Sequence, residues 1–210
     1  MKTIITIQHP QSEQHINRQI GSWADWDLTP LGVTQAECIG KRLAEELSGC
    51  PCRIYSSDLR RARHTAEMVA DCLRTTVTFT DVLREQYLGE AIGKSKEWAR
   101  DHVQTLVWPQ TIDRAASVDG RLFRGAESLR DVWNRLLPFY RQILESSEEY
   151  WILVSHAGTL GVFYAMWLGW NPEMLEKCAL SGKSGGVSFL REDEAGHRMI
   201  ERLNDMSYIL

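Results

Sequence analysis

The stretch WILVS at residues 151–155 decides the fold class, and His156 follows it directly. The run is nearly continuous in apolar residues, which is typical of a parallel strand covered on both faces. Working outward, the segment 127–144 has a strong helical pattern before the run. A second helix is predicted after it, at 159–168. A buried strand flanked by helices in this way indicates an α/β protein.

Strand and helix patterns alternate along the rest of the chain. Short β-branched or apolar runs predict strands at 3–8 (TIITIQ), 53–56, 76–80, 187–191 and 197–203. The last two are candidates to form a hairpin. Thr29-Pro30 has the pattern of an N-cap followed by a first-turn proline and predicts a helix to about residue 47. Ser57 or Asp58 can cap another helix that ends near residue 72.

This alternation predicts a three-layer α/β/α fold with a mainly parallel central sheet. The length of 210 residues suits a single domain, 1–210. Within it, the span 87–125 has no clear strand pattern and is interpreted as a helical lid or insertion.

Composition excludes several classes of protein. Apolar residues make up 43% and charged residues 25%, as in soluble globular proteins. A formal net charge of -4 gives no general basic surface for nucleic acid. No apolar stretch reaches the length of about 18 residues that spans a membrane, and the apolar N-terminal run is too short for a signal peptide. The five cysteines fit neither a zinc site nor a disulfide framework. We therefore expect a cytoplasmic protein with no bound metal.

Polar residues suited to phosphoryl chemistry follow several predicted strands. His9 and His156 come directly after strands, Arg61 lies in the turn after another, and Glu85 lies beyond a third. In parallel sheets, ligands bind beyond the carboxyl ends of the strands, so these side chains should meet at one edge. Neutral imidazole is a good nucleophile, arginine matches phosphate oxygens, and a carboxylic acid can protonate a departing alkoxide.

Five motifs occur in order and resemble those of the histidine phosphatase superfamily, also called phosphoglycerate-mutase-like, from residue 4 to about 190. They are QHPQSEQHINRQIGSWADWDLTPLGVTQA (8–36), IYSSDLRRARHTAEMVA (54–70), LREQYLGEAIGK (83–94), GAESLRDVWNR (125–135) and VSHAGTL (154–160). The resemblance implies a metal-independent phosphomonoester hydrolase that acts through a phosphohistidine on a small phosphorylated metabolite, without a cofactor.

The resemblance also implies residue roles. His9 is the nucleophile, Arg61 binds the transferring phosphoryl group, and His156 bonds a phosphoryl oxygen. Glu85 is the acid-base residue, with neighbouring Glu90 as an alternative. Further phosphate or substrate contacts are expected at Gln8, Ser12, His15, Arg18 and the backbone N–H groups of Ala157 and Gly158.

The chain departs from the family pattern in its first motif. Gln8 stands where the family has arginine, Pro10 stands where it has glycine, and His15 stands where it has asparagine. The site therefore lacks one fixed positive charge, which predicts weakened activity. His15 and Arg18 are candidates to replace that charge.

Two other functions stay open at this stage. A phosphoglycerate-type mutase would use the same phosphohistidine but return the phosphoryl group to a second hydroxyl. A catalytically impaired member would only bind a phosphorylated ligand. The substrate and the oligomeric state, including a homodimer, are not readable from the sequence.

Overall fold

The computed structural model describes residues 1–103 and 117–210, and within them a six-stranded sheet forms the centre. The strand order is β3-β2-β4-β1-β5-β6. The bounds are β1 (Thr3–Gln8), β2 (Arg53–Ser57), β3 (Val77–Thr80), β4 (Tyr150–Ser155), β5 (Val187–Glu192) and β6 (Arg198–Asp205). Strands β1 to β4 run parallel, whereas β5 and β6 form an antiparallel hairpin at one edge. The predicted mainly parallel sheet is confirmed.

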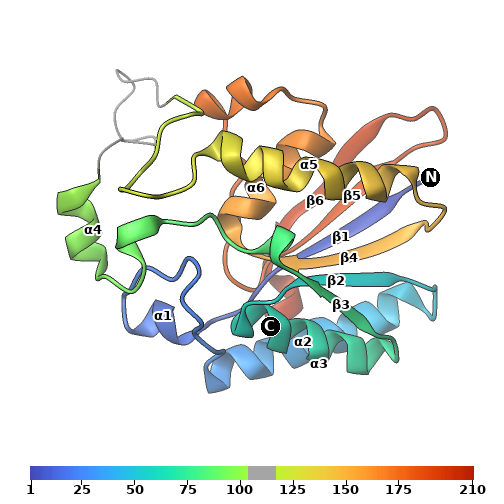
Figure 1. Ribbon diagram of the computed structural model, residues 1–210. Helices are drawn as coiled ribbons and strands as arrows, with labels where there is room; N and C mark the ends of the chain where they lie inside the picture. Colours follow the sequence, from blue (N-terminus) through green and yellow to red (C-terminus); the bar gives the residue numbers. More distant parts are fainter. Residues whose placement is uncertain (104–116) are drawn as a thin grey trace.

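Helices cover both faces of this sheet. Figure 1 shows α5 and α6 on one face and α2 and α3 on the other, as the three-layer prediction requires. The helices are α1 (Glu13–Ile16), α2 (Pro30–Leu47), α3 (Arg60–Leu73), α4 (Lys96–His102), α5 (Leu129–Glu145) and α6 (Ala157–Trp167). Short 3₁₀ turns are η1 (Asp81–Leu83), η2 (Gly89–Ala91), η3 (Pro172–Glu176) and η4 (Met206–Ile209).

The helix boundaries follow local chemistry. Thr29 Oγ1 accepts a hydrogen bond from the Gly32 N–H at 3.0 Å, so the predicted cap of α2 is confirmed. The helix after β4 begins at Ala157, two residues earlier than the pattern predicts, because His156 is already its extended N-cap residue.

Alternating side chains of β4 supply both halves of the core. Trp151 and Leu153 pack with α5 and α6, whereas Ile152 and Val154 pack with α2 and α3. Successive strand residues point to opposite faces, so a strand covered on both sides must be apolar throughout. This explains the unbroken apolar run in WILVS.

The segment predicted as a lid is partly helical. It contains η2 and α4, and Ala91, Ala99, Phe123 and Ala126 form a small hydrophobic cluster of their own. Residues 104–116 of this prediction lie outside the described part of the chain. Among the described residues, no helix combines the length and apolar character needed to cross a bilayer.

Candidate active site

Side chains from the ends of three neighbouring strands meet at the carboxyl edge of the sheet. His9 follows β1 and His156 follows β4, and their ring centroids lie 5.1 Å apart. Arg61, in the first turn of α3 after β2, places its Nε 3.2 Å from His9 Nε2. The structure thus brings together three of the side chains to which the sequence assigned catalysis.

The His9 ring is held in one tautomer. Its Nδ1 lies 2.9 Å from the Pro10 carbonyl oxygen, which can only accept, so Nδ1 carries the proton. Nε2 then presents a lone pair, which accepts the hydrogen bond from Arg61. Burial, reinforced by the positive charge of Arg61 and by His15, holds the pKa of His9 well below its ordinary value. The ring is therefore a neutral base with its lone pair facing the site.

Arg61 is a buried cation that donates to neutral groups. Only 1% of its surface is exposed, and its two terminal nitrogens donate to the carbonyls of Ser22 (2.7 Å) and Ala24 (2.9 Å). Burial lowers its pKa to about 10, against the opposing charges of Glu85 and Asp25, so it stays protonated at neutral pH. Because its hydrogen-bond acceptors are uncharged, the positive charge of Arg61 is not neutralised by a directly bonded carboxylate in the described part of the chain. Such a guanidinium is suited to bind an anion.

His156 offers a polar atom that is not used inside the protein. Its Nε2 lies 2.9 Å from Ser57 Oγ, while its Nδ1 is buried and has no hydrogen-bond partner among the described residues. Burial first, then the charge of Arg61, holds the pKa of His156 well below its ordinary value. Buried polar atoms normally have partners, so an unpaired Nδ1 beside His9 and Arg61 indicates a position for a ligand oxygen.

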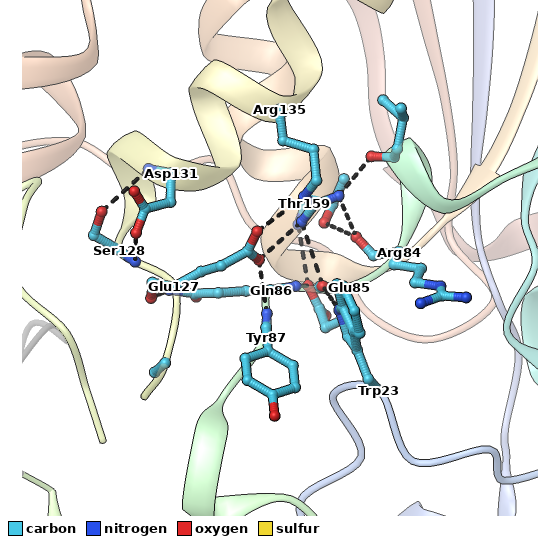
Figure 2. Close-up of polar contacts among 12 residues, drawn as sticks. Trp23, Arg84, Glu85, Gln86, Tyr87, Glu127, Ser128, Asp131, Arg135 and Thr159 are labelled. Atoms are coloured by element: carbon cyan, nitrogen blue, oxygen red, sulfur yellow. Dashed lines mark hydrogen bonds and ion pairs between the residues drawn. The ribbon is translucent and has the colours of Figure 1, made fainter. Parts of the chain in front are cut away.

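The Glu85 carboxylate sits at the start of α6 (Figure 2). Its Oε1 accepts from the Thr159 N–H at 3.1 Å, and its Oε2 accepts from the Gly158 N–H at 3.3 Å. The Gly158 amide, which the sequence assigned to a substrate oxyanion, is therefore already used by Glu85. Glu90, the alternative acid, is exposed on η2, whereas Glu85 lines the cavity that Arg61 also lines.

A half-buried ion pair holds the segment that carries Glu85, as Figure 2 shows. Arg135 of α5 pairs with both oxygens of Glu127 at 3.0 Å and donates to the carbonyls of Val82 and Arg84. Glu127 in turn accepts from the Tyr87 N–H at 2.8 Å. Glu127 and Arg135 lie in the GAESLRDVWNR motif, but nothing in the sequence indicates that they hold the segment of Glu85.

His15 and Ser12 form one side of the site. The His15 ring stacks on His9 at 5.7 Å, and its Nδ1 accepts from the backbone N–H of buried Ser12 at 3.0 Å. Its Nε2 lies 3.2 Å from Ser184 Oγ. Burial, then the charges of Lys96 and Arg61, lower the pKa of His15. His15 is consequently neutral near pH 7, where it does not replace the charge of the missing arginine.

The second candidate for that charge, Arg18, points elsewhere. Its side chain is exposed and pairs with Glu97 at 2.9 Å. Lys96, which the sequence did not single out, instead lines a cavity of about 310 Å³ together with His15, Arg61 and Glu85. The sequence does not rank Arg18 against Lys96, because they lie in two separate segments whose paths decide which residue faces the cavity.

Gln8 is nearly buried, with 9% of its surface exposed, and lies against the glycine-rich loop 182–186. Its backbone N–H donates to the Gly186 carbonyl at 3.1 Å, and its own carbonyl accepts from the Gly185 N–H at 3.0 Å. Its side-chain Oε1 would be 3.1 Å from a Cβ placed on Gly182. The absence of a side chain at Gly182 thus leaves room for the Gln8 amide.

A comparison with protein families identifies the chain. The model of the histidine phosphatase superfamily (branch 1) matches residues 4–206. The chain belongs to this superfamily. Among residues 1–103 and 117–210, no group of three or more His, Cys, Asp or Glu side chains is arranged to hold a metal ion.

Relatives within the histidine phosphatase superfamily carry different names. A 2,3-bisphosphoglycerate-dependent phosphoglycerate mutase from Nitrobacter hamburgensis is 33% identical over 148 residues, which cover 67% of each chain. A protein of the same name from Afipia carboxidovorans is 29% identical and covers 91% of this chain and 93% of its own.

Solved structures of similar fold are named as phosphatases. A mycobacterial glucosyl-3-phosphoglycerate phosphatase superposes with a TM-score of 0.80 at 21% identity, covering 99% of this chain and 100% of its own. A phosphoserine phosphatase from Entamoeba histolytica gives a TM-score of 0.75 at 21% identity and covers both chains fully, 100% each. These structures confirm the superfamily's α/β fold.

Proposed function

We propose that the protein is a phosphomonoesterase that needs no metal and works through a phosphohistidine on His9. The observation that carries this proposal is the pairing of a neutral His9, whose Nε2 lone pair faces the site, with the buried cation Arg61. A transferring phosphoryl group spreads negative charge over its oxygens, so positioning and positive charge supply most of the catalysis.

In the first step, the His9 Nε2 lone pair attacks phosphorus and the bond from phosphorus to the ester oxygen breaks. Arg61 moves its Nε hydrogen bond from His9 to a phosphoryl oxygen, and His156 Nδ1 donates to another. Glu85 donates a proton to the departing alkoxide, which leaves as the alcohol. The product of this step is phosphohistidine.

In the second step, a water oxygen attacks phosphorus and Glu85 takes a proton from that water. The bond from phosphorus to Nε2 breaks, and its electron pair returns to His9 as inorganic phosphate forms. His9 needs no proton at any point of this cycle, which agrees with a pKa far below its ordinary value.

A mutase remains the second candidate, because curated relatives at up to 33% identity carry that name. In a mutase, the phosphoryl group on His9 would pass to a second hydroxyl of the bound molecule instead of to water. The two activities differ only in the final acceptor, so the product distinguishes them.

The test measures phosphate release from a panel of phosphomonoesters in EDTA, with wild type beside His9→Ala and an exposed control, His197→Ala. We expect turnover that EDTA does not affect, that His9→Ala abolishes, and that the control variant retains. Acid-labile phosphate trapped on wild type but not on His9→Ala would support the intermediate directly.

Other outcomes point to the alternatives. Interconversion of 3- and 2-phosphoglycerate without release of phosphate would favour the mutase. If no ester is turned over above the level of His9→Ala, the protein is a phosphate-ligand-binding member of the superfamily, consistent with the loss of the arginine at position 8.

A further inference from the structure

A second cavity adjoins the phosphate site, and its lining is apolar. It has a volume of about 560 Å³ and is bounded mainly by Leu122, Leu129, Val162, Leu175 and Leu180. The polar residues among its described lining are uncharged: Gln86, Cys178 and Ser181. Pockets of about 300–1,000 Å³ with mostly apolar walls are typical small-molecule sites.

The two cavities adjoin each other and share part of their walls. Gln86, Leu122 and Gly158 line both of them. Glu85 lies at this boundary because its carboxylate packs directly against Gly158. A Cβ added to Gly158 would be only 2.6 Å from Glu85 Oε1. A phosphate ester whose phosphoryl group lies at His9 and Arg61 would place its bridging oxygen near Glu85, and the alcohol would extend into the apolar cavity.

Two glycines of α6 make this arrangement possible. Gly158 lets the Glu85 carboxylate approach the helix, and Gly161 lets the Leu180 backbone approach it, since a Cβ there would be 2.8 Å from the Leu180 carbonyl oxygen. Gly158 and Gly161, spaced as GxxG within VSHAGTLG, therefore form part of the surface that Glu85 and the apolar cavity share.

From this placement we infer that the substrates of the protein are phosphate monoesters of uncharged, mainly apolar alcohols. A carboxylate or second phosphate on the alcohol would enter a cavity whose described walls carry no charge to pair with it, and burying an unpaired charge is costly. An alkyl or aryl group would instead bury its surface there. This inference rests on the proposed phosphatase activity.

The test uses a series of linear alkyl phosphates: ethyl, butyl, hexyl and octyl. Their leaving alcohols have nearly the same basicity, so differences in kcat/KM report binding of the chain. Each buried methylene should raise kcat/KM about three- to fourfold, or about tenfold for each two methylenes, until the cavity is filled. Glycerol 3-phosphate and 3-phosphoglycerate should be poorer substrates than butyl phosphate.

A matched pair of variants locates the effect. Both Cys178 and Cys50 are exposed cysteines, but Cys178 is among the residues that line the cavity, whereas Cys50 follows α2 and is not. Cys178→Phe should lower the ratio of octyl to ethyl phosphate kcat/KM at least tenfold, because the added ring occupies space that the chain needs. Cys50→Phe should leave the ratio unchanged.

The outcomes separate this inference from the proposed function. Hydrolysis with no rise along the alkyl series, or with 3-phosphoglycerate preferred to hexyl phosphate, overturns the inference and leaves the phosphatase standing. A rise that Cys178→Phe does not reduce places the preference outside this cavity and also overturns it.

If no ester is hydrolysed, the proposed function fails, and the inference is judged on binding of the same series. The dissociation constants of ethyl to octyl phosphate, measured by calorimetry, should then fall about threefold for each methylene. Equal dissociation constants from ethyl to octyl phosphate would overturn the inference.

Discussion

The nucleophile side and the acid side of the site are built differently. His9, Arg61 and His156 are buried, lie directly at or after strand ends, and are held by short contacts to backbone or to Ser57. Glu85 lies in a loop, is only partly buried, and depends on the side-chain pair of Glu127 and Arg135. Strand ends thus position His9, Arg61 and His156, while loops position Glu85; under the proposed function, the first group would bind the phosphoryl group and the second would face the alcohol.

The largest effect is expected from a change on the nucleophile side. Arg61→Lys keeps a positive charge but loses the planar fork that donates to His9, Ser22 and Ala24 together. We expect kcat/KM to fall about 10²- to 10³-fold in steady-state assays. The control is Arg63→Lys, an exposed position two residues later. A lysine there can keep the ion pair with Glu67. A loss below threefold at Arg61 would contradict its role.

A change on the acid side should cost less. Arg135→Lys removes donors from the Val82 and Arg84 carbonyls and from Glu127, so Glu85 loses its fixed position. We expect kcat to fall about tenfold for an alkyl phosphate, and less for 4-nitrophenyl phosphate, whose leaving group needs little protonation. If Arg135 served only to stabilise the fold, Arg135→Lys would lower kcat equally for the alkyl phosphate and for 4-nitrophenyl phosphate. Arg130→Lys is the control, because Arg130 lies on the same helix and a lysine there can still pair with Asp119 and Glu173.

The buried histidines predict how stability depends on pH. The folded protein keeps His9 and His156 neutral because their pKa values lie well below 6.5, whereas the unfolded chain protonates them near 6.5. Protons therefore favour the unfolded chain, and the free energy of unfolding should fall as pH drops below 6.5. The slope should reach about 1.4 kcal/mol per pH unit for each ring.

Urea unfolding between pH 7.5 and 5 measures this slope. His156→Gln should make it shallower, while the exposed control His197→Gln should not change it. A slope that stays the same in His156→Gln would show that this ring is already protonated in the folded protein near pH 6.

The smallest effect is expected at position 8. Gln8→Arg restores the charge that the family motif has, and a charge-assisted hydrogen bond exceeds a neutral one by about 1 kcal/mol. We expect phosphatase kcat/KM to rise up to about fivefold or to stay unchanged, as measured with the best ester of the panel. A large loss would mean that the site around Gln8 and Gly182 serves a different task.

The nucleophile side was predictable from sequence because its two histidines follow strands directly and its arginine lies in the first helical turn after a strand. WILVS and TIITIQ fix the positions of His156 and His9 along the chain, and parallel strands bring their ends together. Arg61 follows from its place in the first turn after β2. The role of Ser57 as partner of His156 was missed, although both lie in matched motifs, because the contact joins segments far apart in sequence.

The loops around the site, which include the acid side, were less predictable, and for physical reasons. Whether Arg18 or Lys96 faces the cavity depends on the path of two loops that contact each other between Gln19 and Ser95. The charge of His15 depends on its burial, which composition does not show. The Gly158 amide could be assigned to Glu85 only once the loop carrying Glu85 was seen to reach α6.

The position of β1 has a consequence for folding. This strand, which carries His9, lies between β4 and β5, so Thr3 pairs with both Tyr150 and Arg191. Both neighbours come from the last third of the sequence, and such long-range pairings close slowly because a large loop must be ordered first. During synthesis, the strand that carries His9 must therefore wait for residues 150–155 before it has one partner in the sheet, and for residues 187–191 before it has both.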